Sequence, residues 1–436
     1  MTRKDIFQTI IVDNQQQALP PIWERDLAIP LNTGKIVTLS GVRRSGKTYH
    51  LLNAINKIKA HGVTAERIVY INFEDERLDL SSSKELDQLL QAYRELYPDI
   101  SLEKCYFFFD EIQEVAGWEK FVARLYASIT KHIFITGSNA KLLSREIATA
   151  LRGRTITFEI FPLSFSEYVS IRTGSAKRSL NQHTSAGKAR LATLFKKFIR
   201  QGGFPELIEQ NATLREKILQ EYFNVMVLRD LVERYHISQT AILKYFCKRV
   251  IANSAGEFSV NKIYNELKSQ GYQISKDTLY EYANHVENVY LARLVQRYSH
   301  SVVKSELAQK KCYVIDTGLG AALDYKLSQD SGRLLETTIA LELLKHDKQF
   351  TYHRNGFECD FVIMNKGVAR EVIQVAKDVS DPETMERELK GLLNACRNFK
   401  LKKGILLTSD WSEEIQRGTI TITVMPAWQY CLNLTQ

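Results

Sequence analysis

The sequence predicts an α/β protein in which a parallel-sheet domain is followed by a helical middle region and a small C-terminal α/β domain. Three observations lead to this fold class. Short apolar runs alternate with helical patterns before residue 163, a glycine-rich loop follows the first run, and further apolar runs begin beyond residue 330. Strands that are apolar throughout are typical of parallel sheets buried on both faces.

The first domain is expected to span residues 1–163. Between its first two strands, residues 49–60 carry leucine and isoleucine near helical spacing, so a helix is predicted there. This alternation is the βαβ pattern of a parallel sheet covered by helices. The strands are predicted where the chain is continuously apolar, at residues 35–40, 68–73, 105–109 and 132–136.

The middle region is predicted to be helical over residues 164–237 and to form a winged helix over residues 238–311. The second segment has the order helix, helix, turn, helix, strand, and Ser275 stands where the N-cap of the last helix belongs. Acidic residues on this helix oppose phosphate binding, so a packing role and a DNA-binding role both stay open. Neighbouring basic residues could contact a DNA backbone instead: Arg293, Arg297, Lys304, Lys310 and Lys311.

The chain has 59 basic and 50 acidic residues, and most of the excess falls in the middle. Residues 161–330 contain 24 basic and 16 acidic residues, whereas the flanking regions are nearly balanced. A basic patch there would suit nucleic acid or an acidic partner, and an ordinary solvated surface is the alternative.

The six cysteines are scattered and form no Cys-x-x-Cys pair, which suits a reducing cytoplasm and argues against structural zinc. No apolar run approaches the roughly 18 residues of a membrane span. The first residues lack the apolar core of a signal peptide, so secretion is not expected. A cytoplasmic protein with no membrane partner is predicted.

The clearest motif is Gly41-Val-Arg-Arg-Ser-Gly-Lys-Thr48, which matches G-x-x-x-x-G-K-[ST] between a predicted strand and a predicted helix. In such a P-loop, backbone N–H groups at a helix N-terminus point at the phosphates of a nucleotide. Lys47 would supply positive charge to the β- and γ-phosphates, and Thr48 a hydroxyl to Mg²⁺. The rest of the loop would cradle the nucleotide: Gly41, Arg43, Arg44, Ser45 and Gly46.

Two acids follow the third predicted strand. Asp110 and Glu111 come directly after the run Tyr106-Phe-Phe-Phe. Asp110 is expected to complete the Mg²⁺ site, and Glu111 to polarise the attacking water. Together with the loop, the pair predicts a P-loop NTPase domain.

Additional catalytic candidates lie further along the domain. Ser138 or Asn139, after the fourth strand, could contact the γ-phosphate or orient water, although plain turn formers would look the same. Arg152 or Arg154 could neutralise charge in the transition state, within the chain or across to a neighbouring subunit. Surface ion pairs are the alternative for both arginines.

In these motifs the chain resembles a family of bacterial and archaeal AAA-type ATPases whose C-terminal domain has no assigned function. The resemblance implies an AAA-like core that uses ATP and Mg²⁺, a winged-helix middle, and a domain over residues 312–436 similar to restriction-endonuclease-like nucleases. The preference for adenine rests on the resemblance alone. The matching segments extend along nearly the whole chain: residues 41–48, 71–75, 109–113, 135–139, 151–154, 162–165 and 202–206.

A nuclease of that class places one acid on a helix, an Asp on a strand and an acid-x-Lys on the next strand, so that carboxylates bind Mg²⁺. Glu336 and Asp360 fit the first two positions, but Gln374 replaces the third acid and Ala376 the lysine. Lys377 comes one residue late, which places it on the opposite strand face. A degenerate domain that binds nucleic acid or protein is favoured over an active nuclease, and ordinary helix and turn residues are the third reading.

The sequence therefore predicts a Mg²⁺-dependent ATPase that acts as a nucleotide-driven switch on DNA or on a partner protein. The alternatives are an ATP-gated nuclease and a nucleotide-binding scaffold with little turnover. The basic middle region and an arginine acting in trans would both suit an oligomer.

Overall fold

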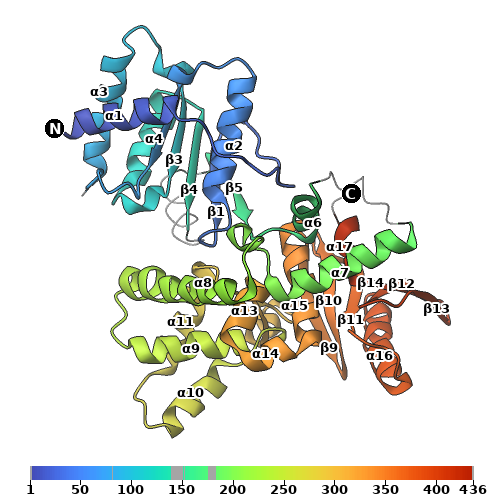
Figure 1. The fold of residues 1–436 in the computed structure, drawn as a ribbon. Helices are drawn as coiled ribbons and strands as arrows, with labels where there is room; N and C mark the ends of the chain where they lie inside the picture. Colours follow the sequence, from blue (N-terminus) through green and yellow to red (C-terminus); the bar gives the residue numbers. More distant parts are fainter. Residues whose placement is uncertain (1, 81, 139–150, 152, 175–182, 435–436) are drawn as a thin grey trace. The chain divides into compact units, whose positions relative to one another are not determined.

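The computed structural model describes the chain except for residues 1, 81, 139–150, 152, 175–182 and 435–436 (Figure 1). The chain divides into two compact units, Met1–Phe161 and Pro162–Gln436. The segments that the sequence suggested as separate beyond residue 163 thus belong to one compact unit. Among the described residues, no helix is both long and apolar enough to span a membrane.

The first unit is built on a five-stranded sheet in the order β2-β3-β4-β1-β5, with every neighbouring pair parallel. Four strands are those predicted from apolar runs. The fifth was not predicted, because as an edge strand it is largely solvent-facing and its sequence is mixed, with Ile156 37% exposed. The strands are β1 (Ile36–Gly41), β2 (Ile68–Asn72), β3 (Tyr106–Asp110), β4 (Ile133–Gly137) and β5 (Thr155–Ile160).

Helices cover both faces of this sheet (Figure 1). Phe107 and Phe109 face a core shared with α1, α3 and α4, whereas Phe108, one residue between them, faces a core shared with α2. Because all strands run the same way, their carboxyl ends meet at one edge. The helices are α1 (Arg3–Gln16), α2 (Lys47–Ala60), α3 (Asp87–Leu96) and α4 (Trp118–Ser128), with short 3₁₀ turns at Ala65–Arg67, Ser83–Leu86, Leu102–Lys104 and Ile112–Glu114.

The second unit begins with helices and a small antiparallel sheet in the order β6-β8-β7. The helices predicted after residue 238 are present, and Ser275 caps α11 by accepting the N–H of Thr278 at 3.0 Å. The elements are α6 (Phe165–Thr173), α7 (Ser185–Gln201), α8 (Ala212–Val225) with a π-helical continuation (Met226–Glu233), α9 (Thr240–Ala252), β6 (Gly256–Phe258), α10 (Val260–Ser269), α11 (Lys276–Asn288), β7 (Ala292–Val295), α12 (Val302–Leu307), β8 (Lys310–Val314), α13 (Thr317–Leu323) and α14 (Tyr325–Gln329).

The chain then forms a six-stranded mixed sheet in the order β13-β14-β12-β11-β10-β9. One face packs on α15 and α17, through Phe361 and Ile373, and the other packs on α16, through Val362 and Val372. The elements are α15 (Ser331–Lys345), β9 (Gln349–Asn355), β10 (Phe357–Asn365), β11 (Val368–Val375), α16 (Pro382–Asn398), β12 (Lys403–Thr408), β13 (Glu413–Arg417), β14 (Ile420–Pro426) and α17 (Ala427–Asn433).

The glycine pair Gly202-Gly203, which follows α7, contacts the start of α13 in the second unit. Gly202 has φ 76°, in the left-handed region, and a Cβ there would lie 2.0 Å from Asp316 Oδ1. The N–H of Gly203 donates to Asp316 Oδ2 at 2.7 Å, and the other oxygen caps α13 through the N–H of Leu319 at 2.9 Å. The end of α7 is thereby attached to the start of α13.

Candidate functional site

The predicted P-loop connects β1 to α2 at the carboxyl edge of the first sheet. Arg44 has φ 63° and Gly46 φ 100°, so the chain turns through two left-handed residues before the helix starts. Gly46 is the N-cap and offers no side chain, which leaves the first N–H groups of α2 available to an anion. Gly41 is also required, because a Cβ there would lie 2.1 Å from the carbonyl oxygen of Ile160 on β5.

Lys47 is buried, and its ammonium is held at the loop. Nζ donates to the carbonyls of Gly41 at 3.1 Å and Val42 at 3.2 Å, and lies 3.3 Å from Glu111 Oε1. The structure thus brings together the two residues that the sequence assigned to phosphate binding and to water activation.

Asp110 is buried at the end of β3 and surrounded by hydroxyl groups. Its carboxylate accepts hydrogen bonds from Tyr70 Oη at 3.0 Å and from Thr136 Oγ1, and the side chain of Thr48 bonds it as well. Burial, and then the charge of Glu111, raise the pKa of Asp110. The two predicted Mg²⁺ residues, Thr48 and Asp110, are therefore neighbours.

Glu111 stands in a left-handed conformation, φ 50°, immediately after the strand. Its N–H donates to Thr136 Oγ1 at 2.8 Å, and its Oε2 accepts from Gln113 Nε2 at 2.6 Å. Burial alone would raise the pKa of Glu111, but the positive charges of Lys47 and Arg43 outweigh it and lower this pKa. The side chain is therefore a carboxylate at neutral pH.

Two buried hydroxyls at this edge have no hydrogen-bond partner in the described part of the chain: Ser45 Oγ in the loop and Ser138 Oγ after β4. A buried hydroxyl without a partner is costly, and phosphate oxygens are strong acceptors. These two hydroxyls, together with Lys47, Thr48 and Asp110, fit a nucleoside triphosphate with Mg²⁺.

Two further arginines support the loop. Arg43 pairs with Glu74 at 2.9 Å, which gives a structural role to the first acid of the segment after β2. Arg25, which sequence reasoning missed, donates to the carbonyl of Ser45 at 3.0 Å and to that of Phe161 at 2.9 Å. No local pattern marks Arg25, because its partners lie 20 and 136 residues away.

Arg154 lies at the amino ends of the strands, whereas the P-loop lies at their carboxyl ends. Its carbonyl accepts the N–H of Ile36, the first residue of β1, at 2.8 Å. The phosphate loop leaves the other end of this strand, about 17 Å away at the usual rise of ~3.3 Å per residue. The guanidinium lies over Tyr126, 5.6 Å from the ring centroid. Arg154 therefore does not reach the phosphates of its own chain; Arg152 and Asn139 lie outside the described residues.

In the second unit, the three nuclease-like positions do come together. Glu336 on α15 and Asp360 on β10 both contact one cation, and Gln374 on β11 accepts the N–H of Asp360 at 3.2 Å. That cation is Lys311 of β8, whose Nζ lies 2.9 Å from Glu336, 2.7 Å from Glu358 and 2.9 Å from Asp360. We call this group the Lys311 cluster.

Lys311 corrects one expectation from the sequence. It was grouped with residues that could contact a DNA backbone, but it is buried, and three carboxylates surround its ammonium. Burial opposes its charge, yet Asp360 and the other neighbours outweigh this effect and raise the pKa of Lys311. Among the described residues, no three His, Cys, Asp or Glu side chains are arranged to hold a metal ion.

The positions after Gln374 follow the strand alternation. Ala376, at the lysine position, packs in the core against α16, while Lys377 is exposed. Gln374 Nε2 donates to Glu388 on α16 at 2.7 Å, so the amide links two elements.

Comparison with known proteins agrees with the P-loop fold of the first unit. The family model described as AAA domain matches residues 33–169, and a Domain of unknown function (DUF8612) matches residues 192–331. The chain is 35% identical over 444 residues to the uncharacterized protein MJ1544 of Methanocaldococcus jannaschii, covering 99% of this chain and 96% of that protein. The chain belongs to the MJ1544 family. An uncharacterized protein of Haemophilus influenzae is 31% identical over 91% of this chain and 94% of its own length.

This chain thus combines an AAA-type P-loop domain with a second, larger unit. Among solved structures, the Aeropyrum pernix ORC1 protein in complex with DNA aligns with a TM-score of 0.30 and 11% identity, over 76% of this chain and 92% of that one.

Proposed function

We propose that the protein is a Mg²⁺-dependent ATPase that works as a nucleotide-driven switch on nucleic acid or on a partner protein. One arrangement carries this proposal. Lys47, Asp110 and Glu111 meet at the carboxyl edge of the sheet, beside the two buried hydroxyls of Ser45 and Ser138 that have no partner among the described residues.

In the proposed reaction, the N–H groups of the loop and Lys47 bind the β- and γ-phosphates, and Thr48 and Asp110 hold the Mg²⁺ position. The metal supplies charge neutralisation at the phosphates. When phosphate oxygens replace Glu111 as the partner of Lys47, the Glu111 carboxylate becomes free to accept the proton of the attacking water. The new bond joins that water oxygen to the γ-phosphorus, and the bond to the β-phosphate oxygen breaks.

The remaining sequence candidates enter this proposal with smaller roles. Ser138 or Asn139 contacts the γ-phosphate or orients the water; of the two, Ser138 is the one whose buried hydroxyl has no partner among the described residues. If Arg154 supplies an arginine finger, it acts across to a neighbouring subunit, because Arg154 stands at the far end of its own strands. That geometry requires an oligomer.

For the second unit, we propose that residues 238–311 act as a winged-helix module and that the last region is a degenerate nuclease-like domain. Gln374 in place of an acid and Lys311 among the carboxylates both support a binding role over cleavage of nucleic acid. The ATP-gated nuclease is therefore the weaker alternative.

The decisive measurement is steady-state ATP hydrolysis by the wild type and by Glu111→Gln, with and without DNA. We expect hydrolysis to fall by about 10²–10⁴-fold in the variant, the range of general base catalysis. Glu103→Gln is the matched control, since Glu103 is an exposed acid in the 3₁₀ turn that precedes the same strand. ATP binding without hydrolysis in the wild type would replace the switch by the scaffold alternative.

A further inference from the structure

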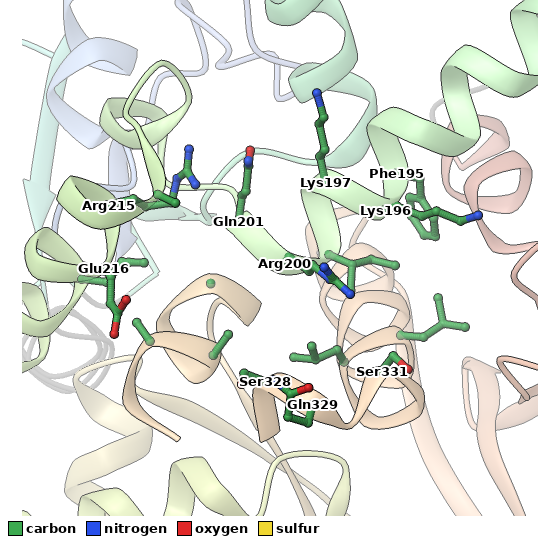
Figure 2. Close-up of a pocket in the computed structure, with 18 of the residues that line it drawn as sticks. Phe195, Lys196, Lys197, Arg200, Gln201, Arg215, Glu216, Ser328, Gln329 and Ser331 are labelled. Carbon is green, nitrogen blue, oxygen red and sulfur yellow. The ribbon is translucent and has the colours of Figure 1, made fainter. Parts of the chain in front are cut away.

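The second unit contains a large cavity between α7, α8 and the α13–α15 segment (Figure 2). Its volume is about 1520 Å³, above the ~300–1,000 Å³ of typical small-molecule sites. The cavity therefore has room for a segment of a polymer.

One wall is a basic face of α7. Lys196, Lys197, Arg200 and Gln201 all line the cavity, and their spacing places them on one side of the helix. The helix has five basic residues and no acidic one. The surrounding stretch, residues 168–205, contains eight basic residues and no Asp or Glu. This stretch accounts for much of the positive charge of the middle region.

The basic side chains of this wall are not neutralised within the protein. In the part of the chain that the structure describes, Lys197 and Arg200 are exposed and their side chains make no ion pair or hydrogen bond. Lys196 lies 3.4 Å from Asp410, with both side chains more than half exposed, which is a weak pairing. Glu216 is the one acid among the residues that line the cavity, and Lys377, following β11, adds another cation.

The other wall offers hydrogen-bonding groups without charge. Ser328, Gln329 and Ser331 line it across from α7 (Figure 2). Four of the large apolar side chains of the lining are buried in the protein, Phe195, Leu219, Leu334 and Leu335, and two are half-buried, Ile199 and Leu323. An amphipathic peptide would need fully exposed apolar anchors, and none of these six side chains is fully exposed.

We propose that this cavity binds single-stranded nucleic acid through its phosphate backbone. The proposal rests on the proposed function, because it names the class of molecule on which the switch acts. A polyanion with a charge on every unit fits a wall on which Lys197 and Arg200 have no ion-pair partner among the described residues and Lys196 has a weak one. A concave site with donors and acceptors on the facing wall admits one strand, whereas a duplex is a convex cylinder whose bases are already paired. Because the aromatic ring of Phe195 is buried, binding does not depend on base stacking.

The test uses the full chain without nucleotide and a fluorescent oligothymidylate of about 12 nucleotides, a length within known single-strand site sizes. Anisotropy titrations at several salt concentrations give the Kd and its salt slope. In Lys197→Gln/Arg200→Gln we expect the affinity to fall on the order of tenfold, and the salt slope to decrease by about 1.4, or ~0.7 for each lost phosphate contact. Lys197→Arg/Arg200→Lys should bind as the wild type does.

The matched control is Lys188→Gln/Arg190→Gln, which removes the same charge from exposed positions of the same helix that do not line the cavity. If both double variants weaken oligonucleotide binding equally, the proposed site is wrong, because the oligonucleotide is then attracted by the overall positive charge of the helix. The proposal also falls if the wild type does not bind the oligonucleotide at low salt. Tighter binding of a duplex or of polyglutamate, weakened by the same double variant, overturns it in favour of another occupant.

The ATPase proposal is tested independently. If ATP hydrolysis depends on Glu111 but the oligonucleotide does not bind, only the proposal for the cavity is refuted. If the oligonucleotide binds but ATP is not hydrolysed, only the ATPase proposal is refuted.

Discussion

The ammonium of Lys311 lies 2.9 Å from the carboxylate of Asp360, 49 residues further along the chain. This contact joins β8 of the three-stranded sheet to β10 of the six-stranded sheet. It also places a lysine where the nuclease-like positions converge, with Tyr313 Oη donating to Glu336 at 2.9 Å beside it. The Lys311 cluster thus has its own cation.

Removing that cation should destabilise the protein. Lys311→Met leaves three carboxylates facing one another in a largely buried place, so we expect the free energy of unfolding to fall by about 3–5 kcal/mol. Urea denaturation followed by fluorescence measures it. Lys310→Met, one residue earlier on the same strand, should change stability by less than about 0.5 kcal/mol. A similar small effect for Lys311→Met would mean that the cluster is solvated and structurally unimportant.

The cluster should also make stability depend on pH. Burial, and then the charge of Asp360, raise the pKa of Glu336 from 4.5 to about 7. Between these two pH values the folded state therefore holds a proton that the unfolded state has released. The resulting stabilisation of the folded state is fully present at low pH and is lost as pH rises from about 5 to 7. The slope is at most ~1.4 kcal/mol per pH unit. Measuring the free energy of unfolding against pH for the wild type and for Glu336→Gln isolates the contribution of Glu336. Parallel curves for the two proteins would show that the pKa of Glu336 is not raised.

Nuclease activity should be absent. With Gln374 and Lys311 in place of a metal-binding acid and a metal, we expect intact plasmid after incubation with the protein and Mg²⁺ or Mn²⁺, with or without ATP. Gel electrophoresis decides the matter. Cleavage that disappears in Asp360→Asn would restore the ATP-gated nuclease.

Arg25 should support nucleotide binding from outside the motif. Arg25→Met removes two charge-assisted hydrogen bonds that hold the loop to the end of β5. At ~1.5–3 kcal/mol for such a bond, one of them is worth tenfold or more in affinity. We expect the Kd for ATP, measured by equilibrium titration, to rise on the order of tenfold.

Arg154→Met is the control for that experiment, since Arg154 stands at the opposite edge of the same sheet. Its ATP affinity should equal that of the wild type. If its hydrolysis rate per molecule nevertheless falls, and falls most at high protein concentration, Arg154 acts in trans. Equal weakening of ATP binding by both variants would mean that Arg25 has no specific role.

The sequence could indicate which residues lie together where the relevant contacts are local, while the roles assigned to these residues stay predictions. Lys47 contacts the carbonyl of Gly41, six residues earlier, and Asp110 and Glu111 are adjacent at a strand end. The apolar runs of β1 to β4 were recognisable because burial on both faces requires apolar side chains throughout. The edge strand β5 escaped prediction because its side chains are mixed.

The sequence by itself determined the P-loop motif, the parallel sheet that carries it and the basic character of the middle region. Only the tertiary structure decided which distant charges meet: Arg25 with the loop, Lys311 with three carboxylates, and Arg154 with none of the phosphate site. The physical reason is the distance along the chain over which each effect acts. Glycine conformation, strand burial and motif spacing act over a few residues, whereas an ion pair depends on where the packed chain brings two side chains, whatever their separation in sequence.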